Sequence, residues 1–240
     1  MLKLIVHISL ALLATNTFAE SIEKISYKFK GKEIETYICK PNSSNYKEAV
    51  IYMHGANIRG QIGGTPKRAC LRIAKDGYLA VSPLRPPQPE IKPLSNQQLK
   101  QLMGFIKRTV RFVEELPNIE KVHMIGYSEG GIGTLRYATA TSNLASATVL
   151  GASASPKALK KLAKKISTPL LLMVAANDTG SKTSLNHNFV ESTKKLANEL
   201  KANSKTYSYI VLPSYKDDGH KVFWEMGSYW DNIIDFLKKY

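Results

Sequence analysis

A serine in a glycine-rich turn is the strongest chemical signal in the sequence. Residues 126–130 read Gly-Tyr-Ser-Glu-Gly and fit the pattern G-x-S-x-G, between a predicted strand and a predicted helix. Such a turn strains the backbone of the serine, and Gly126 and Gly130 remove side chains that would collide across it. Ser128 would then stand above the sheet at a helix N-terminus, where free N-H groups favour negative charge. We therefore expect Ser128 to be a nucleophile; the alternative is a serine that only caps a helix.

A serine hydroxyl is a poor nucleophile until a base takes its proton, so a histidine is required. His220 is the candidate base because it lies in a polar loop after the last predicted strand, from which it can reach across the strand ends. The alternative is a solvated loop histidine. The other histidines lie in the N-terminal segment, before a glycine turn, inside a strand and at a helix start: His7, His54, His123 and His187.

The histidine in turn needs a carboxylate that orients its ring. Residues 169–176 form an apolar run that leads directly to Asn177 and Asp178. The chain order Ser128, Asp178, His220 is the order expected for a hydrolase built on a parallel sheet. Asp217 and Asp218 are the rivals, although they lie off any predicted strand end.

Short apolar runs bounded by turn residues alternate with helical stretches along the chain. A hairpin around residues 31–32 comes first, and a proline-rich segment at residues 83–93 is either a rigid connector or a wall of the substrate cleft. The predicted strands are 25–29, 34–39, 49–53, 78–82, 121–125, 145–150, 170–175 and 207–212, and the predicted helices are 65–75, 96–115, 130–141, 156–164, 184–201 and 223–238.

This alternation predicts an α/β fold with a mostly parallel sheet, helices on both faces and an antiparallel hairpin at one edge. In such a sheet, catalytic groups gather at the carboxyl ends of the strands. With 240 residues and no linker, we expect one domain over residues 20–240.

Residues 1–19 are typical of a cleavable secretory signal. Lys3 gives a positive start, residues 4–14 are largely apolar, and Thr17-Phe18-Ala19 places small residues where a signal peptidase reads. A short anchor or a first core helix is the alternative. The signal predicts export, to the periplasm or the medium if the host is bacterial.

The remaining chain is strongly basic, with 33 basic and 19 acidic residues and a net charge of +14 after cleavage. Such a charge favours anionic surroundings, including lipid head groups and acidic glycans. The densest cluster, residues 157–165, has helical spacing without interleaved aromatic residues, which indicates a solvated helix face and not a nucleic-acid groove. We expect no nucleic-acid partner.

Two cysteines, Cys39 and Cys70, are present. An exported protein meets an oxidising compartment, so a disulfide between them is one outcome, but their spacing leaves the pairing open. The sequence has no CxxC motif and no His/Cys spacing typical of a metal site, so we expect no metal.

Taken together, the motifs resemble those of the α/β-hydrolases, and most closely the dienelactone hydrolase-like serine esterases and a related peptidase-like branch. The segments that carry the resemblance are residues 53–55, 74–78, 126–131, 178 and 219–220. The resemblance implies a Ser-Asp-His triad that transfers an acyl group to water without a cofactor. Residues 84–86 depart from it, because Leu-Arg-Pro stands where such families carry an acidic residue and a glycine. No inserted cap of helices is visible between residues 151 and 169.

The resemblance also implies an oxyanion hole made by the backbone N-H groups of Glu129 and of Ala56 or Asn57. His54 would then shape the turn and not act as a catalyst. The candidate substrate contacts are Asn57, Arg59, Arg85 and Tyr127; for the two arginines the alternative is ordinary surface charge.

The resulting hypothesis is an exported serine hydrolase that cleaves a carboxylic ester, with a thioester as a variant of that substrate. A peptidase of short peptides or amides is the first alternative. A non-catalytic binding protein on the same fold is the second, because a fold does not fix a function.

Overall fold

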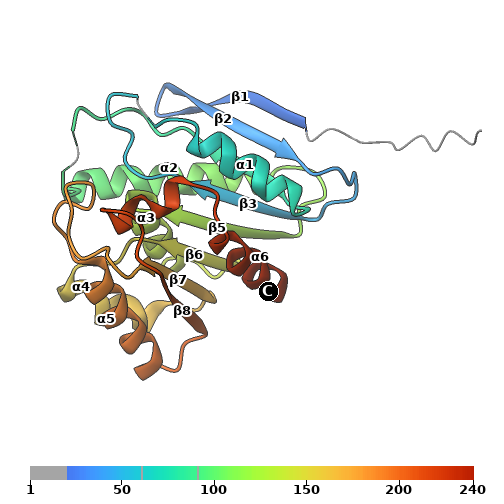
Figure 1. Cartoon of the computed structure of the whole chain (residues 1–240). Helices are drawn as coiled ribbons and strands as arrows, with labels where there is room; N and C mark the ends of the chain where they lie inside the picture. Colours follow the sequence, from blue (N-terminus) through green and yellow to red (C-terminus); the bar gives the residue numbers. More distant parts are fainter. Residues whose placement is uncertain (1–20, 61, 91) are drawn as a thin grey trace, which may run out of the picture.

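An eight-stranded sheet organises the chain, and helices cover both of its faces (Figure 1). The computed structural model describes residues 21–60, 62–90 and 92–240, so the predicted signal at residues 1–19 lies outside the described residues. The strands are β1 (Ser21–Phe29), β2 (Lys32–Lys40), β3 (Glu48–Met53), β4 (Leu79–Pro83), β5 (Lys121–Tyr127), β6 (Ser146–Leu150), β7 (Leu170–Ala175) and β8 (Tyr207–Leu212). Their order is β1-β2-β4-β3-β5-β6-β7-β8.

The predicted parallel sheet with one antiparallel edge is confirmed. β1 pairs antiparallel with β2, and β2 with β4, whereas all pairs from β4 to β8 are parallel. Because the central strands are buried on both faces, they read as continuous apolar runs and not as alternating ones. In β3, for example, Ile51 packs into the core on one face of the sheet and Val50 into the core on the other.

Within the described ranges, two helices cover one face of the sheet and four cover the other. The helices are α1 (Thr65–Lys75), α2 (Asn96–Glu114), α3 (Glu129–Ala138), α4 (Pro156–Lys165), α5 (Phe189–Ala202) and α6 (Tyr229–Lys239), with a short 3-10 helix, η1, over Gly219–Trp224. The buried residues of α1 and α6 belong to one core cluster, and those of α2 to α5 belong to the other. In Figure 1, α1 and α6 lie in front of the sheet.

The structure corrects two predicted helices. The helix predicted over residues 184–201 begins at Phe189, because the side chain of Asn188 caps it by accepting a hydrogen bond from the N-H of Glu191. Residues 182–186 form turns instead. The helix predicted over residues 223–238 is interrupted: η1 ends at Trp224, Glu225 is extended, and α6 begins at Tyr229.

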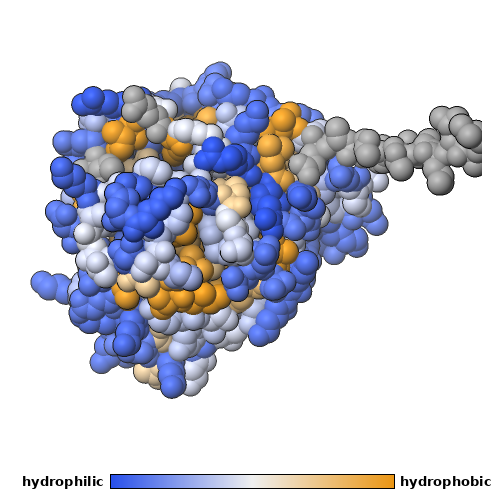
Figure 2. Space-filling view, viewed as in Figure 1, coloured by the Kyte–Doolittle hydropathy of each residue, from blue (hydrophilic) through white to orange (hydrophobic). Residues whose placement is uncertain are grey.

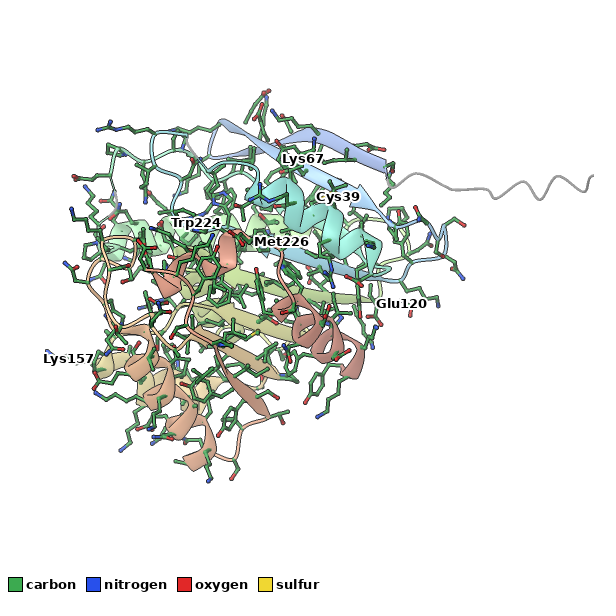
Figure 3. All side chains as sticks on the ribbon, viewed as in Figure 1. Cys39, Lys67, Glu120, Lys157, Trp224 and Met226 are labelled. Carbon is green, nitrogen blue, oxygen red and sulfur yellow. A yellow bond between two sulfur atoms is a disulfide. The ribbon has the colours of Figure 1, made fainter. Side chains whose placement is uncertain are left out.

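The two cysteines form a disulfide that joins the sheet to a helix. Cys39 of β2 and Cys70 of α1 are both fully buried, with 5.7 Å between their Cα atoms. Figure 3 labels Cys39 where β2 runs beside α1. The bridge closes a sequence separation of 31 residues and therefore ties α1 to the antiparallel edge.

Removing this bridge is expected to cost about 3–4 kcal/mol of the free energy of unfolding, because the unfolded chain regains the entropy of the open loop. The measurement is urea unfolding of the double variant Cys39→Ala, Cys70→Ala beside the oxidised wild type. A reductant should weaken the wild type and leave the double variant unchanged. A loss below about 1 kcal/mol in the double variant would contradict a stabilising bridge.

The face seen in Figure 2 is largely hydrophilic, with hydrophobic residues in separate patches. On α4 the five lysines of residues 157–165 are exposed and Leu159, Leu162 and Ala163 are buried, so the lysine cluster forms an exposed helix face. No described helix has the length and apolar character needed to cross a membrane.

Candidate active site

Ser128 lies in a strained turn between β5 and α3. Its φ of 52° and ψ of −118° place it outside the regions that non-glycine residues ordinarily occupy. A Cβ on Gly126 would lie 2.3 Å from Thr134 Oγ1, and one on Gly130 would lie 2.1 Å from the carbonyl oxygen of Met53. Neither position therefore has room for a side chain. The side chain of Ser128 makes no capping hydrogen bond to α3, which rules out the reading of a serine that only caps a helix.

The structure brings Ser128, His220 and Asp178 into one hydrogen-bonded chain. His220 Nε2 is 2.9 Å from Ser128 Oγ, and His220 Nδ1 is 2.9 Å from Asp178 Oδ2. Because an ionised carboxylate only accepts, Nδ1 carries the hydrogen and Nε2 is left to accept the serine proton. Both His220 and Asp178 are 1% exposed, so the pair is shielded from solvent.

The segments around His220 fix the position of its ring. It lies in η1 and not in the open loop that the sequence suggested. The ring of Phe189 stacks on it, with 5.2 Å between centroids and 14° between planes. The carbonyl oxygen of Asp178 accepts hydrogen bonds from the N-H groups of Phe189 and Val190, which tie the start of α5 to the end of β7.

The rival carboxylates have other partners. Asp218 accepts hydrogen bonds from Ser181 Oγ at 3.0 Å, from Thr183 Oγ1 at 2.6 Å and from the N-H of His220 at 3.1 Å. It therefore joins the loop at residues 181–184 to the start of η1 without touching the imidazole. Asp217 is exposed and lies 3.9 Å from Lys221 Nζ. Of the three aspartates, Asp178 is the one that contacts the ring of His220.

The turn after β3 faces Ser128 and is built on His54. His54 Nδ1 donates to the carbonyl oxygen of Gly55 at 2.7 Å, and His54 Nε2 accepts from the N-H of Arg85 at 2.9 Å. The ring is 1% exposed, and burial, assisted by the charge of Arg85, holds the pKa of His54 well below 6.5. Ala56 follows this turn and lines the same cavity as Ser128. Within the described chain, no hydrogen bond occupies the N-H of Ala56 or of Glu129.

The four candidate substrate contacts have different surroundings. Tyr127 lines the cavity beside Ser128, and its hydroxyl donates to the carbonyl oxygen of His220 and accepts from Trp224 Nε1. Asn57 is buried, and its Nδ2 donates to the carbonyl oxygen of Arg85. Arg59 is exposed. Arg85 is 8% exposed and holds the turn, so the reading of this arginine as surface charge is wrong.

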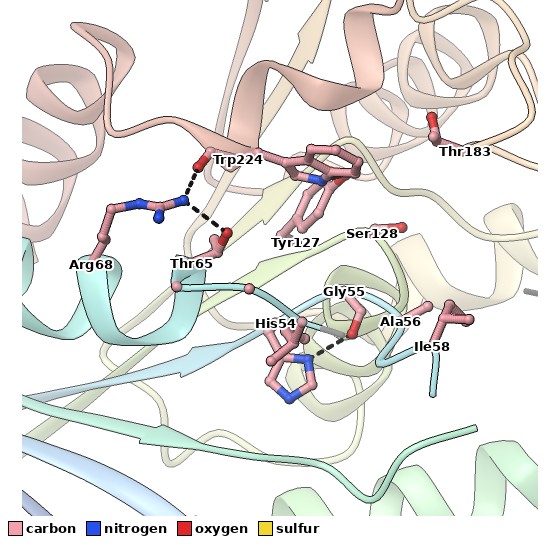
Figure 4. A pocket seen from close by; sticks show the side chains of 13 residues that line it. His54, Gly55, Ala56, Ile58, Thr65, Arg68, Tyr127, Ser128, Thr183 and Trp224 are labelled. Carbon is pink, nitrogen blue, oxygen red and sulfur yellow. Dashed lines mark hydrogen bonds between the residues drawn. The ribbon is translucent and has the colours of Figure 1, made fainter. Parts of the chain in front are cut away.

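A cavity of about 430 Å³ opens on one side of Ser128 (Figure 4). Its walls include residues 54–56 and 63–65 together with Ile58, Arg68, Tyr127 and Trp224. A smaller cavity of about 80 Å³, which Lys92, Pro93 and Leu94 help to line, reaches Ser128 from another side. The proline-rich segment is therefore part of the cleft wall. No motif in the sequence marks Arg68 or Trp224 as residues of this cleft.

Two other described histidines lie away from Ser128. His123 is fully buried, 2.7 Å from Ser146 Oγ and 3.3 Å from Glu48 Oε2. Burial lowers its pKa below 6.5, and the nearby Glu48 only partly opposes this effect. His187 Nε2 lies 3.0 Å from Ser192 Oγ. No group of three or more His, Cys, Asp or Glu that could hold a metal ion occurs in the described ranges.

The buried histidines predict that acid destabilises the fold. His54 and His123 have lowered pKa values when folded, so below the ordinary pKa of 6.5 the unfolded chain binds more protons. Their contribution is present above pH 6.5 and is lost as the pH falls below it, by up to about 1.4 kcal/mol per pH unit for each histidine. Urea unfolding between pH 7.5 and 5 measures this slope, and the variant His123→Gln should reduce it. A free energy of unfolding that stays constant over this range would contradict the prediction.

Residues 34–225 match the model of the dienelactone hydrolase family. This stretch includes the Ser128 turn, Asp178 and His220. The chain belongs to the dienelactone hydrolase family. The resemblance drawn from the motifs is thereby confirmed. A search of curated proteins found no match to the sequence of this chain.

Solved structures share the fold of this family member. A protein of Klebsiella pneumoniae subsp. pneumoniae assigned as a dienelactone hydrolase is 18% identical, with a TM-score of 0.68 over 92% of this chain and 100% of that one. An esterase of Pyrococcus furiosus is 12% identical, with a TM-score of 0.66 over 92% and 93%. The acylaminoacyl peptidase of Pyrococcus horikoshii is 14% identical, with a TM-score of 0.66 over 91% of this chain and 41% of that one. The α/β-hydrolase fold is therefore confirmed, and the family indicates a hydrolase of the ester or peptide type.

Proposed function

We propose that this protein is an exported serine hydrolase that cleaves a small carboxylic ester or thioester. The observation that carries the proposal is the hydrogen-bonded chain from Ser128 through His220 to Asp178. Family membership and the esterase among the similar structures support it. The mechanism needs only the side chains and backbone groups at this site.

In the proposed reaction Ser128 Oγ attacks the carbonyl carbon of the ester, while His220 Nε2 takes the hydroxyl proton. Asp178 holds Nδ1-H and stabilises the imidazolium that forms. The N-H groups of Ala56 and Glu129 donate to the oxyanion. His220 then gives the proton to the leaving alcohol as the ester bond breaks. Water next attacks the acyl-enzyme with His220 again as base, and the proton returns to Ser128 Oγ as the bond to the acyl group breaks and the acid is released. Each oxyanion donor is expected to contribute on the order of 3 kcal/mol of transition-state stabilisation.

Two observations bear on the substrate and on export. Arg68 is the charged side chain among the described residues that line the larger cavity, and its partners are the neutral oxygens of Thr65 and Trp224, at 3.2 and 2.9 Å (Figure 4). An acyl or alcohol group with an anionic end would therefore gain an ion pair. The disulfide between Cys39 and Cys70 supports export, because such bonds persist in oxidising compartments.

Arg68→Gln is expected to lower kcat/KM for an anionic ester such as a hemisuccinate by about fivefold, which corresponds to about 1 kcal/mol for a partly exposed ion pair. The value for a neutral acetate ester should change less than about twofold. Lys67→Gln is the matched control, because Lys67 lies on the same turn of α1 but does not line the cavity. An equal change for anionic and neutral esters would remove Arg68 from substrate recognition.

A panel of nitrophenyl esters, acyl thioesters and aminoacyl anilides tests the proposed function. We expect kcat/KM to be highest for short esters and thioesters. A higher kcat/KM for the anilides would instead favour a peptidase. The structural similarity to acylaminoacyl peptidase is the reason to test this alternative, although the match covers only 41% of that chain. A folded wild type without turnover of any compound would contradict the proposal.

A further inference from the structure

A buried arginine links the two segments that would form the oxyanion hole. Arg85 lies in the loop after β4, and its side chain is 9% exposed. Its Nη2 donates to the carbonyl oxygen of His54 at 3.0 Å and also to that of Gly55. Its Nη1 lies 3.1 Å from Glu129 Oε1, in the residue that follows the serine. A single guanidinium thus contacts both the turn after β3 and the turn after β5.

The backbone of the loop after β4 is hydrogen-bonded to the turn after β3. The N-H of Gln88 donates to the carbonyl oxygen of Asn57, and the N-H of Arg59 donates to that of Gln88, both at 2.8 Å. The side chain of Asn57 donates to the carbonyl oxygen of Arg85 at 2.7 Å. Gln88 Nε2 adds a hydrogen bond to Glu129 Oε2 at 3.1 Å. The clamp, which we define as Arg85, Gln88 and Glu129, is therefore held from several directions.

The contact to Gly55 has a consequence for Ala56. The carbonyl of Gly55 and the N-H of Ala56 belong to one planar trans peptide group, so they point in opposite directions. His54 Nδ1 and Arg85 Nη2 both donate to that carbonyl oxygen, so the N-H of Ala56 points away from these two donors. Turning the peptide over would break both hydrogen bonds, and it would leave the buried Nδ1 of His54 without an acceptor and Arg85 with one partner fewer, which is costly.

We propose that Arg85, with Glu129 as its counterion, is a positioning residue that fixes the Gly55–Ala56 peptide so that the N-H of Ala56 faces the oxyanion. The guanidinium acts through the turn and does not contact the substrate. The inference rests on the proposed hydrolase function. The proposal also assigns a function to residues 84–86, where Leu-Arg-Pro departs from the pattern of similar families, because Arg85 would support the oxyanion hole from behind.

The test compares Arg85→Lys and Glu129→Gln with wild type. Lysine keeps the charge but loses the planar fork that reaches two carbonyls and a carboxylate. Glutamine keeps the shape of Glu129 but removes the counterion. Because loss of one oxyanion donor typically costs 10²–10³ in kcat, we expect kcat for the best ester to fall by about 10²-fold in Arg85→Lys, with KM changed less than about threefold. Glu129→Gln should show a smaller fall of the same kind.

A second readout separates positioning from general stability. Affinity for a trifluoromethyl ketone, which becomes a tetrahedral oxyanion on Ser128, should fall in parallel with kcat, whereas affinity for the carboxylic acid product should not. Arg111→Gln is the control, since Arg111 lies on α2, is exposed and is outside the clamp. Thermal unfolding shows that each variant is folded, and Glu129→Gln carries the test if Arg85→Lys does not fold.

Wild-type turnover of an ester, measured first, establishes the proposed function independently. If the wild type turns over and the folded Arg85 and Glu129 variants keep kcat and ketone affinity within about twofold of it, the positioning role is wrong while the hydrolase function stands. A parallel loss of product affinity would also overturn the inference, because it would indicate a general distortion of the site.

Discussion

Ser128→Ala is expected to lower kcat for the best ester by about 10⁴–10⁶-fold, because it removes the atom that would form the acyl-enzyme. Alanine keeps the same backbone conformation and loses one hydrogen bond to His220. The free energy of unfolding should therefore change by less than about 1.5 kcal/mol. Steady-state kinetics and urea unfolding of the same preparation measure both effects.

Ser155→Ala is the matched control for this variant. Ser155 precedes α4, is exposed and makes no capping hydrogen bond with its side chain, so its removal should leave both kcat and stability unchanged. If Ser128→Ala keeps more than about one per cent of wild-type turnover, the reaction does not use Ser128 as its nucleophile.

Asp178→Asn is expected to lower kcat by about 10⁴-fold while the fold is retained. The carboxylate accepts the hydrogen of His220 Nδ1, whereas the amide of asparagine can turn its NH₂ toward the ring and favour the tautomer with hydrogen on Nε2. That tautomer cannot accept the proton of Ser128. The measurement is kcat at a pH where the wild type is fully active.

Asp217→Asn removes a carboxylate from the loop that precedes η1 and serves as the comparison. The side chain of Asp217 is 83% exposed, so this variant should keep wild-type kcat. Asp218→Asn should act mainly on stability, since Asp218 joins Ser181 and Thr183 to the segment of His220. A large loss of kcat in Asp217→Asn with little in Asp178→Asn would reverse the assignment.

The sequence was most informative where backbone geometry allows few residue types. The turn at Ser128 has room only for glycine at positions 126 and 130, so it could be recognised from the sequence. Parallel strands that are buried on both faces require apolar runs, so the fold class could be predicted as well. The candidates Asp178 and His220 followed from the rule that catalytic groups gather at strand ends, and the structure places His220 against Ser128 and Asp178 against His220.

Contacts between distant loops could not be predicted. Arg85 lies 44 positions before Glu129, and an arginine in a polar loop carries no sign that it will be buried against two carbonyls. Trp224 reaches the cavity only because η1 folds back after β8. The start of α5 was misplaced because Asn188, and not an apolar pattern, decides it.

Labelling with a fluorophosphonate tests the central claim most directly, because this reagent forms a stable bond only with a serine that a neighbouring base activates. We expect wild-type protein to be labelled stoichiometrically on the peptide that contains Ser128, with slower labelling in Asp178→Asn and none in Ser128→Ala or His220→Ala. Folded wild-type protein that stays unlabelled, or that carries the label on another residue, would contradict the account.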